Sequence, residues 1–167
     1  LTQAPVGRNR RVSSNEQPNW NDGNFDMTWL EPGEELEFPT LQGPGVINHM
    51  WMTSHSGGMN ELNALSLRIY WDGRDAPDVE VPLGDFFATG ERPAVVESMP
   101  VQVGPTGSLT CYWRMPFAES ARIVVTNDNP ARATGLYWIV DWVELDSLPP
   151  DTGHFCAKYR QEYPAVM

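Results

Sequence analysis

The run GPGVINHMWMT, residues 43–53, carries the side chains with the clearest chemical potential. A Gly-Pro-Gly turn leads into a predicted strand, whose side chains alternate between two faces. One face bears His49, Trp51 and Thr53, while the other carries methionines and is typical of a core. An imidazole beside an indole suits a sugar platform or a subunit contact. The structural alternative is a hydrogen-bonded His beside a half-buried Trp.

Asp141, in the run YWIVDWVEL, is the acidic residue best placed for chemistry. Alternation puts it in an apolar row, where a carboxylate must be paired, hydrogen-bonded or protonated. In a functional role it would be a general acid or a substrate ligand. A structural role, pairing with an arginine, is the favoured interpretation. The candidate partners are Arg68, Arg114 and Arg122.

Other acidic residues gather around a predicted hairpin. Asp78 and Glu80 share a predicted strand face at about 7 Å, a spacing that could serve glycoside hydrolysis, although such a pair is more often solvated. The tip WDGRD, with Asp72, Arg74 and Asp75, is typical first of a turn and second of a ligand contact.

The sequence predicts no cofactor. It contains no phosphate loop, no dinucleotide fingerprint and no nucleophile elbow. Its three histidines, His49, His55 and His154, lack zinc-ligand spacing, so no metal site is expected. A structural calcium ion held by loop side chains is a possibility without an EF-hand pattern. Those side chains are Asn21, Asp22, Asn24 and Asp26.

The two cysteines, Cys111 and Cys156, have no metal-binding spacing and lie far apart in the chain. They could form one disulfide or remain two buried thiols. The second interpretation is favoured, because Cys111 shares an apolar strand face with Leu109, Trp113 and Met115.

The composition indicates a globular, acidic domain. A length of 167 residues fits one domain, and seven Trp is a high count. A net charge of −11 argues against nucleic acid and anionic membranes, and it suits a neutral ligand such as a sugar. The N-terminal LTQAPVGRNRR lacks a signal-peptide core, and no apolar run approaches the ~18 residues of a membrane span. The cellular compartment stays open.

Alternation and regularly spaced Gly, Pro, Asn and Asp predict about eight short strands and no long helix. We expect an all-β jelly-roll β-sandwich of antiparallel strands. Residues 1–28 are predicted as an extended arm or loop, 29–150 as the jelly roll, and 151–167 as a tail or linker. The predicted strands lie in residues 36–41, 45–53, 65–73, 75–84, 93–104, 107–117, 119–128 and 134–146.

Several runs, taken in order, resemble glycoside hydrolase family 172. RVSS and a GNxD-like piece (Gly23, Asn24 and Asp26) come first, followed by GPGVINHMWMT. LRIYWDG, VEVPLGDFF, LTCYWRMPF and ARIVVTN follow, and YWIVDWVEL and LPPDTGHFCAKYRQEYP come last. Each run is weak alone, but the ordered set is specific and covers nearly the whole chain.

The resemblance implies a jelly roll from enzymes that carry two such domains in tandem. Those enzymes assemble as trimers or hexamers with active sites at subunit contacts, in a shape similar to double jelly-roll capsid proteins. Their activities are on furanosides: α-fructofuranosyl linkages, difructose anhydrides and D-arabinan. The mechanism is retaining, with one glutamate as nucleophile and another as acid/base.

The sequence departs from the family pattern at the catalytic motifs. The family's two glutamates belong to motifs of the kind GEGD and GTGTEDY in the second roll, and neither occurs here. The chain therefore resembles the first roll alone, and the catalytic pair maps onto no residue. Cys156 is a second departure, since the family often has His in an FHAxW-like run, and it could pair with Cys111.

Three hypotheses follow. The chain is the first roll of a furanosidase, providing scaffold, subunit interface and substrate contacts. Alternatively it is a non-catalytic single roll that self-assembles into a homo-oligomer, shell or filament. A third hypothesis is a single-roll enzyme using Asp141 or Asp85. The expected partners are a furanoside-containing glycan and further copies, as a trimer or hexamer, or a separate second-roll chain. The matching runs supply the candidate substrate contacts Ser13, Asn24, Asp26, His49, Trp51, Asp85 and Phe86.

Overall fold

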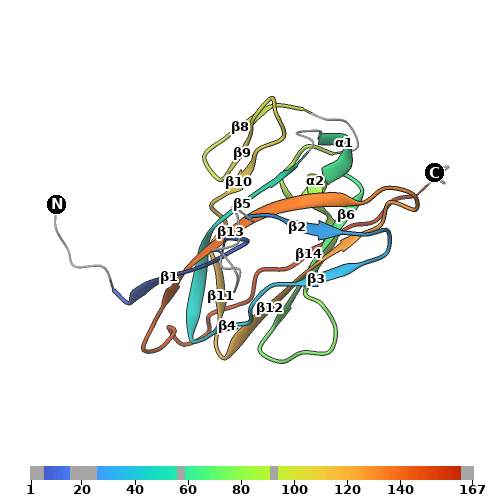
Figure 1. Cartoon of the computed structure of the whole chain (residues 1–167). Coiled ribbons are helices and arrows are strands. Elements are labelled where there is room, and N and C mark those ends of the chain that lie inside the picture. The colour runs from blue at the N-terminus through green and yellow to red at the C-terminus, as the bar shows by residue number, and fades with distance from the viewer. Residues whose placement is uncertain (1–5, 16–25, 56–58, 91–93, 163–167) are drawn as a thin grey trace.

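Two β-sheets packed face to face form this protein, as the computed structural model in Figure 1 shows. The structure describes residues 6–15, 26–55, 59–90 and 94–162. The predicted all-β sandwich is confirmed. No helix within the described ranges is long and apolar enough to cross a membrane.

The larger sheet has eight strands and contains the run that carries His49 and Trp51. Its path is β1-β13-β5-β10-β9-β8, with β2 added to β13 and β11 added to β5. The strands are β1 (Arg8–Ser13), β2 (Thr28–Leu30), β5 (Gly45–Ser54), β8 (Val96–Glu97), β9 (Val101–Val103), β10 (Leu109–Cys111), β11 (Met115–Phe117) and β13 (Thr134–Glu144).

The smaller sheet has six strands in the order β14-β7-β6-β12-β3, with β4 also paired to β12. Two helices of one turn each, α1 (Met59–Leu62) and α2 (Leu83–Phe86), connect strands. The strands are β3 (Glu35–Glu37), β4 (Leu41–Gln42), β6 (Leu65–Trp71), β7 (Val79–Pro82), β12 (Ser120–Asn127) and β14 (Ala157–Lys158). β14 joins β7 in parallel.

The core lies between the sheets and follows the period of two in each long strand. Alternate side chains of β6, from Leu65 to Trp71, are at most 1% exposed. Met50 and Met52 of β5 are fully buried, as expected of the methionine face. Phe38 stacks on Trp138 of β13 with ring centroids 3.9 Å apart. Burying each such side chain contributes about 1.5–3 kcal/mol.

The WDG sequence makes the predicted turn. Asp72 and Gly73 have φ values of +53° and +71°, a pair of left-handed residues that an Asp-Gly hairpin turn requires. Asp72 Oδ1 accepts hydrogen bonds from the backbone N–H groups of Glu119 and Ser120, and its Oδ2 lies 2.7 Å from His154 Nε2. Asp72 therefore joins this turn to two other segments.

The structure has more and shorter strands than the sequence predicted. Residues 8–13, expected in an arm or loop, form β1 along the edge of β13. Their polar run RNRRVS shows no alternation, and the strand is defined by its pairing with β13 rather than by its own pattern. Residues 151–167, expected as a tail or linker, supply the edge strand β14.

Candidate functional site

His49, Asp141 and Arg11 meet on the outer face of the larger sheet. They come from three adjacent strands, because the ladder sets Asp141 opposite both His49 and Arg11. His49 Nδ1 lies 2.8 Å from Asp141 Oδ2. Arg11 Nε donates to Asp141 Oδ1 at 2.7 Å, and Arg11 Nη2 donates to Oδ2 at 3.0 Å. The carboxylate is thus held from both sides.

The environment keeps Asp141 ionised. Partial burial alone would raise its pKa, but hydrogen bonds from Arg11 and His49 outweigh that effect and lower the pKa. The same contact raises the pKa of Arg11. An ionised Asp141 accepts a hydrogen bond from His49 Nδ1–H, which leaves Nε2 as the ring nitrogen that does not face the carboxylate. Among the described residues, no group hydrogen-bonds to Nε2.

A β-bulge opens the surface beside His49. Asp141 pairs with His49 and Trp142 pairs with Ile47, so Asn48 has no opposite residue on β13. A hollow of about 340 Å³ lies here, and we call it the imidazole hollow. The Tyr112 ring stacks on the imidazole with centroids 5.2 Å apart. The lining residues are Asn9, Arg10, Asn48, His49, Tyr112, Asp141 and Trp142.

Trp51 and Thr53 continue the outer row of β5 and contact the turn between β9 and β10. Trp51 Nε1 donates to Ser108 Oγ at 2.8 Å, and Thr53 Oγ1 donates to the carbonyl of Gly107 at 3.1 Å. Both side chains are half-buried. These bonds satisfy the polar atoms and hold the indole in one orientation beside His49.

An aromatic group lies at the far end of the same face. The His55 ring meets Trp29 edge-on at 5.8 Å, and His55 Nδ1 lies 3.2 Å from the Tyr137 hydroxyl. Gly135 lies beneath this group, because a Cβ there would meet Met27 Sδ first, and would come 2.9 Å from His55 Cβ and 3.0 Å from the Trp29 ring. The absence of a side chain at Gly135 lets the rings pack against β13.

A second depression, which we call the terminal groove, adjoins the imidazole hollow. It has a volume of about 880 Å³ and lies between the larger sheet and residues 147–155. Asn48 lines both spaces. Val143 in the groove pairs across the sheet with Asn9 in the hollow. The two spaces are therefore neighbours on one face. Residues lining the groove include Val46, Asn48, Arg114, Pro116, Val143 and Leu148.

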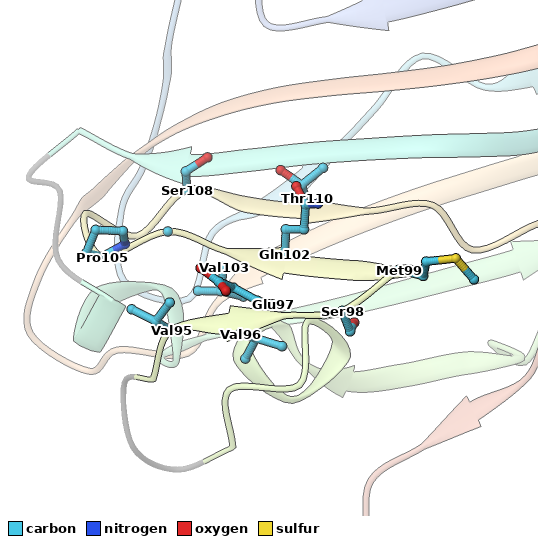
Figure 2. A pocket seen from close by; sticks show the side chains of 11 residues that line it. Val95, Val96, Glu97, Ser98, Met99, Gln102, Val103, Pro105, Ser108 and Thr110 are labelled. Atoms are coloured by element: carbon cyan, nitrogen blue, oxygen red, sulfur yellow. The ribbon is translucent and has the colours of Figure 1, made fainter.

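A third depression, of about 740 Å³, runs along the edge of the same sheet. Figure 2 shows its side chains along β8, β9 and β10. Val95 is 55% exposed and Met99 is 93% exposed, so this edge presents apolar groups to solvent. β8 ends the path of the larger sheet, with β9 on its paired side.

Comparison with known proteins matches this β-sandwich to one family. A family model described as "GH172 domain-like" matches residues 24–139, which is more than half of the chain. The chain belongs to this GH172 domain-like family. No curated protein matches the sequence. The match covers His49 and Trp51 and ends two residues before Asp141.

None of the other described residues taken from the family resemblance lines the imidazole hollow. Ser13 is buried, and Asp26 is half-buried. Asp85 and Phe86 belong to α2, which packs on β6 and β7 of the smaller sheet. Phe86 is 7% exposed and meets Phe87 and Phe155 edge-on. Asn24 and the possible calcium ligands Asn21 and Asp22 lie outside the described residues.

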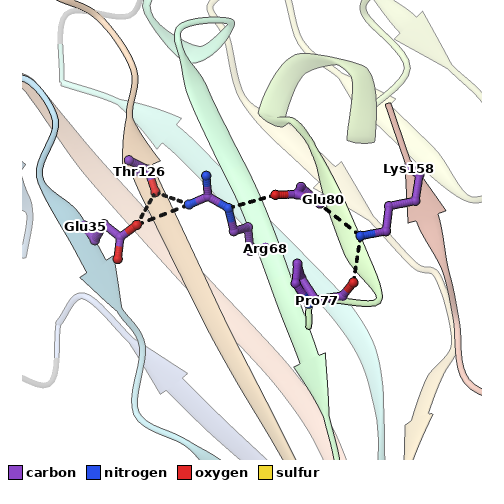
Figure 3. Close-up of polar contacts among 6 residues, drawn as sticks. All are labelled: Glu35, Arg68, Pro77, Glu80, Thr126 and Lys158. Atoms are coloured by element: carbon purple, nitrogen blue, oxygen red, sulfur yellow. Dashed lines mark hydrogen bonds and ion pairs between the residues drawn. The ribbon is translucent and has the colours of Figure 1, made fainter. Parts of the chain in front are cut away.

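The outer face of the smaller sheet carries a network of ion pairs (Figure 3). Arg68 donates to Glu35, Thr126 and Glu80, and Lys158 lies 3.3 Å from Glu80. Hydrogen bonds from Arg68 and Lys158 lower the pKa of Glu80.

Glu80 is therefore paired, and Asp78 has a separate partner in Arg74 at 2.7 Å. Across the described residues, no group of three or more His, Cys, Asp or Glu could hold a metal ion.

Two predictions need correction. Arg11 pairs with Asp141, whereas the proposed partners Arg68 and Arg122 lie on the other sheet and Arg114 lines the terminal groove. The row containing Asp141 also points outward, since the inner row of β13 runs through Trp138 and Trp142.

The cysteines are both free thiols, so the alternative disulfide does not form. Cys111 is buried as predicted, and burial raises its pKa to about 12. The prediction for Cys156 is wrong: it is exposed, because it lies in the tail at the edge of the smaller sheet.

Sequence reasoning missed Arg11 and Tyr112 as neighbours of His49. Arg11 lies 130 positions from Asp141, and no local pattern connects them. Tyr112 follows β10, whose register places Cys111 beside Met50, so the next residue reaches His49. A correct strand pairing would have found both.

Proposed function

We propose that this chain is a furanoside-binding jelly-roll domain of a retaining glycosidase. The outer face of its larger sheet supplies substrate contacts and the contact with neighbouring subunits. The catalytic glutamates come from a second roll, since the motifs GEGD and GTGTEDY do not occur in this sequence. The observation that carries the proposal is the imidazole hollow beside Trp51 within a family of glycoside hydrolase type.

The chemistry of the hollow suits one sugar ring. The volume of about 340 Å³ lies at the lower end of small-molecule sites. Tyr112 is 48% exposed and offers a ring face. His49 Nε2 can form a hydrogen bond with a hydroxyl, which both donates and accepts, and the amides of Asn9 and Asn48 offer further donors and acceptors. A neutral polyol would be recognised by such groups without a charge of its own.

Calorimetric titration with methyl arabinofuranoside and methyl fructofuranoside tests the proposal, with methyl glucopyranoside as the control ligand. We expect a furanoside to bind and the pyranoside to bind more weakly. Trp51→Ala removes the indole beside His49 and should weaken binding about tenfold. Tyr70→Ala is the matched variant, since Tyr70 is half-buried on the other sheet beneath Arg122. Equal binding by both variants, or no furanoside binding, contradicts the proposal.

Hydrolysis separates this function from a single-roll enzyme. We expect the isolated chain to bind 4-nitrophenyl furanosides without turning them over, because Asp141 is ionised and held by Arg11 and His49. Turnover that disappears in Asp141→Asn would assign catalysis to this chain instead.

The open edge at β8 favours the second candidate, self-assembly. Exposed Val95 and Met99 beside an edge strand are groups that a neighbouring copy would cover. Light scattering of the pure chain tests this function. Homo-oligomers that dissociate in Met99→Lys support it, and a monomer at all concentrations contradicts it.

A further inference from the structure

The terminal groove is larger than the imidazole hollow and has a different chemistry. Val46, Val143 and Pro116 give it apolar side chains from three paired strands, and Leu148 comes from the segment that follows β13. No acidic residue is among the described residues that line it. In a chain of net charge −11, such a surface is distinctive. An apolar ring or short chain would be desolvated here.

Arg114 is the cationic residue of the groove, and it has no carboxylate partner among the described residues. Arg10 and Arg11, which lie on the same sheet, are both paired with acids. His154, the other titratable group at the groove, has its Nε2 engaged by Asp72. The Arg114 guanidinium is therefore free to bind a carboxylate through two parallel hydrogen bonds.

The two spaces can hold one ligand. Asn48 lines both, and the paired residues Asn9 and Val143 lie one in each. A sugar in the imidazole hollow can direct its anomeric substituent toward the terminal groove, which has room for a large one. Its volume of about 880 Å³ is within the range of pockets for drug-sized molecules.

We infer that the terminal groove binds the aglycone of the furanoside, and that this aglycone is an apolar ring or chain bearing a carboxylate. The inference rests on the proposed function, because the sugar ring anchors the ligand. Arg114 is then a specificity-determining residue, which distinguishes acidic from neutral aglycones.

Three arabinofuranosides that differ only in the aglycone test the inference: methyl, phenyl and 4-carboxyphenyl. We expect affinity to rise from methyl to phenyl, and to rise about tenfold again for 4-carboxyphenyl. Arg114→Gln should abolish the second increase and keep the first. Leu148→Ala should reduce the first. Arg132→Gln, an exposed arginine remote from the groove lining, is the control and should bind all three like the wild type.

The outcomes separate the two ideas. Equal affinity for the three glycosides overturns the inference and leaves the proposed function in place. A carboxylate increase that persists in Arg114→Gln also overturns it. Failure of all three glycosides to bind overturns the proposed function, and the inference with it.

Discussion

The outer face of the smaller sheet and the outer face of the larger sheet differ in how their polar groups are satisfied. On the smaller sheet, the half-buried Arg68 and the exposed Glu80 belong to a network of ion pairs whose acids reach solvent. On the larger sheet, Trp51 and His49 stand half-buried, and one carboxylate, Asp141, is fixed by direct partners. The polar groups of the smaller sheet's outer face are satisfied by one another and by water. The larger sheet's outer face presents ring faces and an imidazole nitrogen that a ligand can contact.

The two faces thus show how one β-sandwich can separate solubility from binding. Exposed ion pairs contribute little to stability, but they keep a sheet face hydrated and free of apolar patches. Aromatic and imidazole rings on the outer face of the larger sheet can be desolvated at low cost, because ring faces are apolar and the nearby Asp141 carboxylate is already paired. Substitutions on the two faces test how far this division holds.

Gly135→Ala should have the largest effect on stability, about 2 kcal/mol, because overpacking a tight contact costs about 1–3 kcal/mol. The added methyl group would press on Met27 Sδ first, and on Trp29 and His55, at the end of the larger sheet's outer face. Urea denaturation measures the loss. Gly153→Ala is the control, since nothing lies within 4 Å of its Cβ position. Equal stability of the two variants would show that the aromatic group is loosely packed.

Arg11→Ala should destabilise more than Arg68→Ala, although each change removes one arginine from an outer face. Loss of Arg11 leaves the part-buried Asp141 with His49 alone, which costs about 1–2 kcal/mol. Loss of Arg68 breaks pairs with the exposed acids Glu35 and Glu80, which costs at most about 1 kcal/mol. Thermal denaturation at low salt checks the order. A larger loss for Arg68→Ala would contradict the contrast between the faces.

The loss of unfolding free energy at acid pH should depend on Asp141 more than on Glu80. Both pKa values are lowered by folding, so the ionised forms stabilise the fold at neutral pH. That stability is present above the unfolded values of about 4 and is lost as the pH falls through the lower folded values. Denaturation between about pH 5 and pH 2 should therefore be less steep in Asp141→Asn than in the wild type.

Glu80→Gln is the matched control for the pH experiment, and it should change the slope less because Glu80 is 48% exposed. Asp72, whose pKa is also lowered, titrates equally in all three proteins. A steeper loss of stability at acid pH in Asp141→Asn than in the wild type would contradict the assignment of an ionised Asp141.

Strands with strong alternation could be predicted from the sequence alone. In β6, apolar residues at every second position face polar ones, so the inner face is unambiguous. In β13, both rows carry apolar side chains, such as Ile139 in one and Val140 in the other. Alternation then shows which residues share a face but not which face is buried. Because the row of Asp141 also contains Ile139, its alternation resembles that of a buried row, although it faces outward.

The candidate site was predicted in part for a similar reason. His49 and Trp51 lie in one strand, so their shared face follows from local geometry. Arg11 and Tyr112 reach them only through the register of β1 and β10 against the central strands. Long-range pairing of that kind is set by the whole sheet. Phe86 belonged to a matching run, yet the packing of α2 makes it part of the core.

Hydrogen–deuterium exchange with and without a furanoside tests most directly which face binds. Binding at the outer face of the larger sheet should add protection in β5, in β13 and in the residues around Tyr112, with β6 and β12 unchanged. Added protection confined to β6 and β12 would contradict it, and so would a saturating ligand that leaves β5 and β13 unprotected.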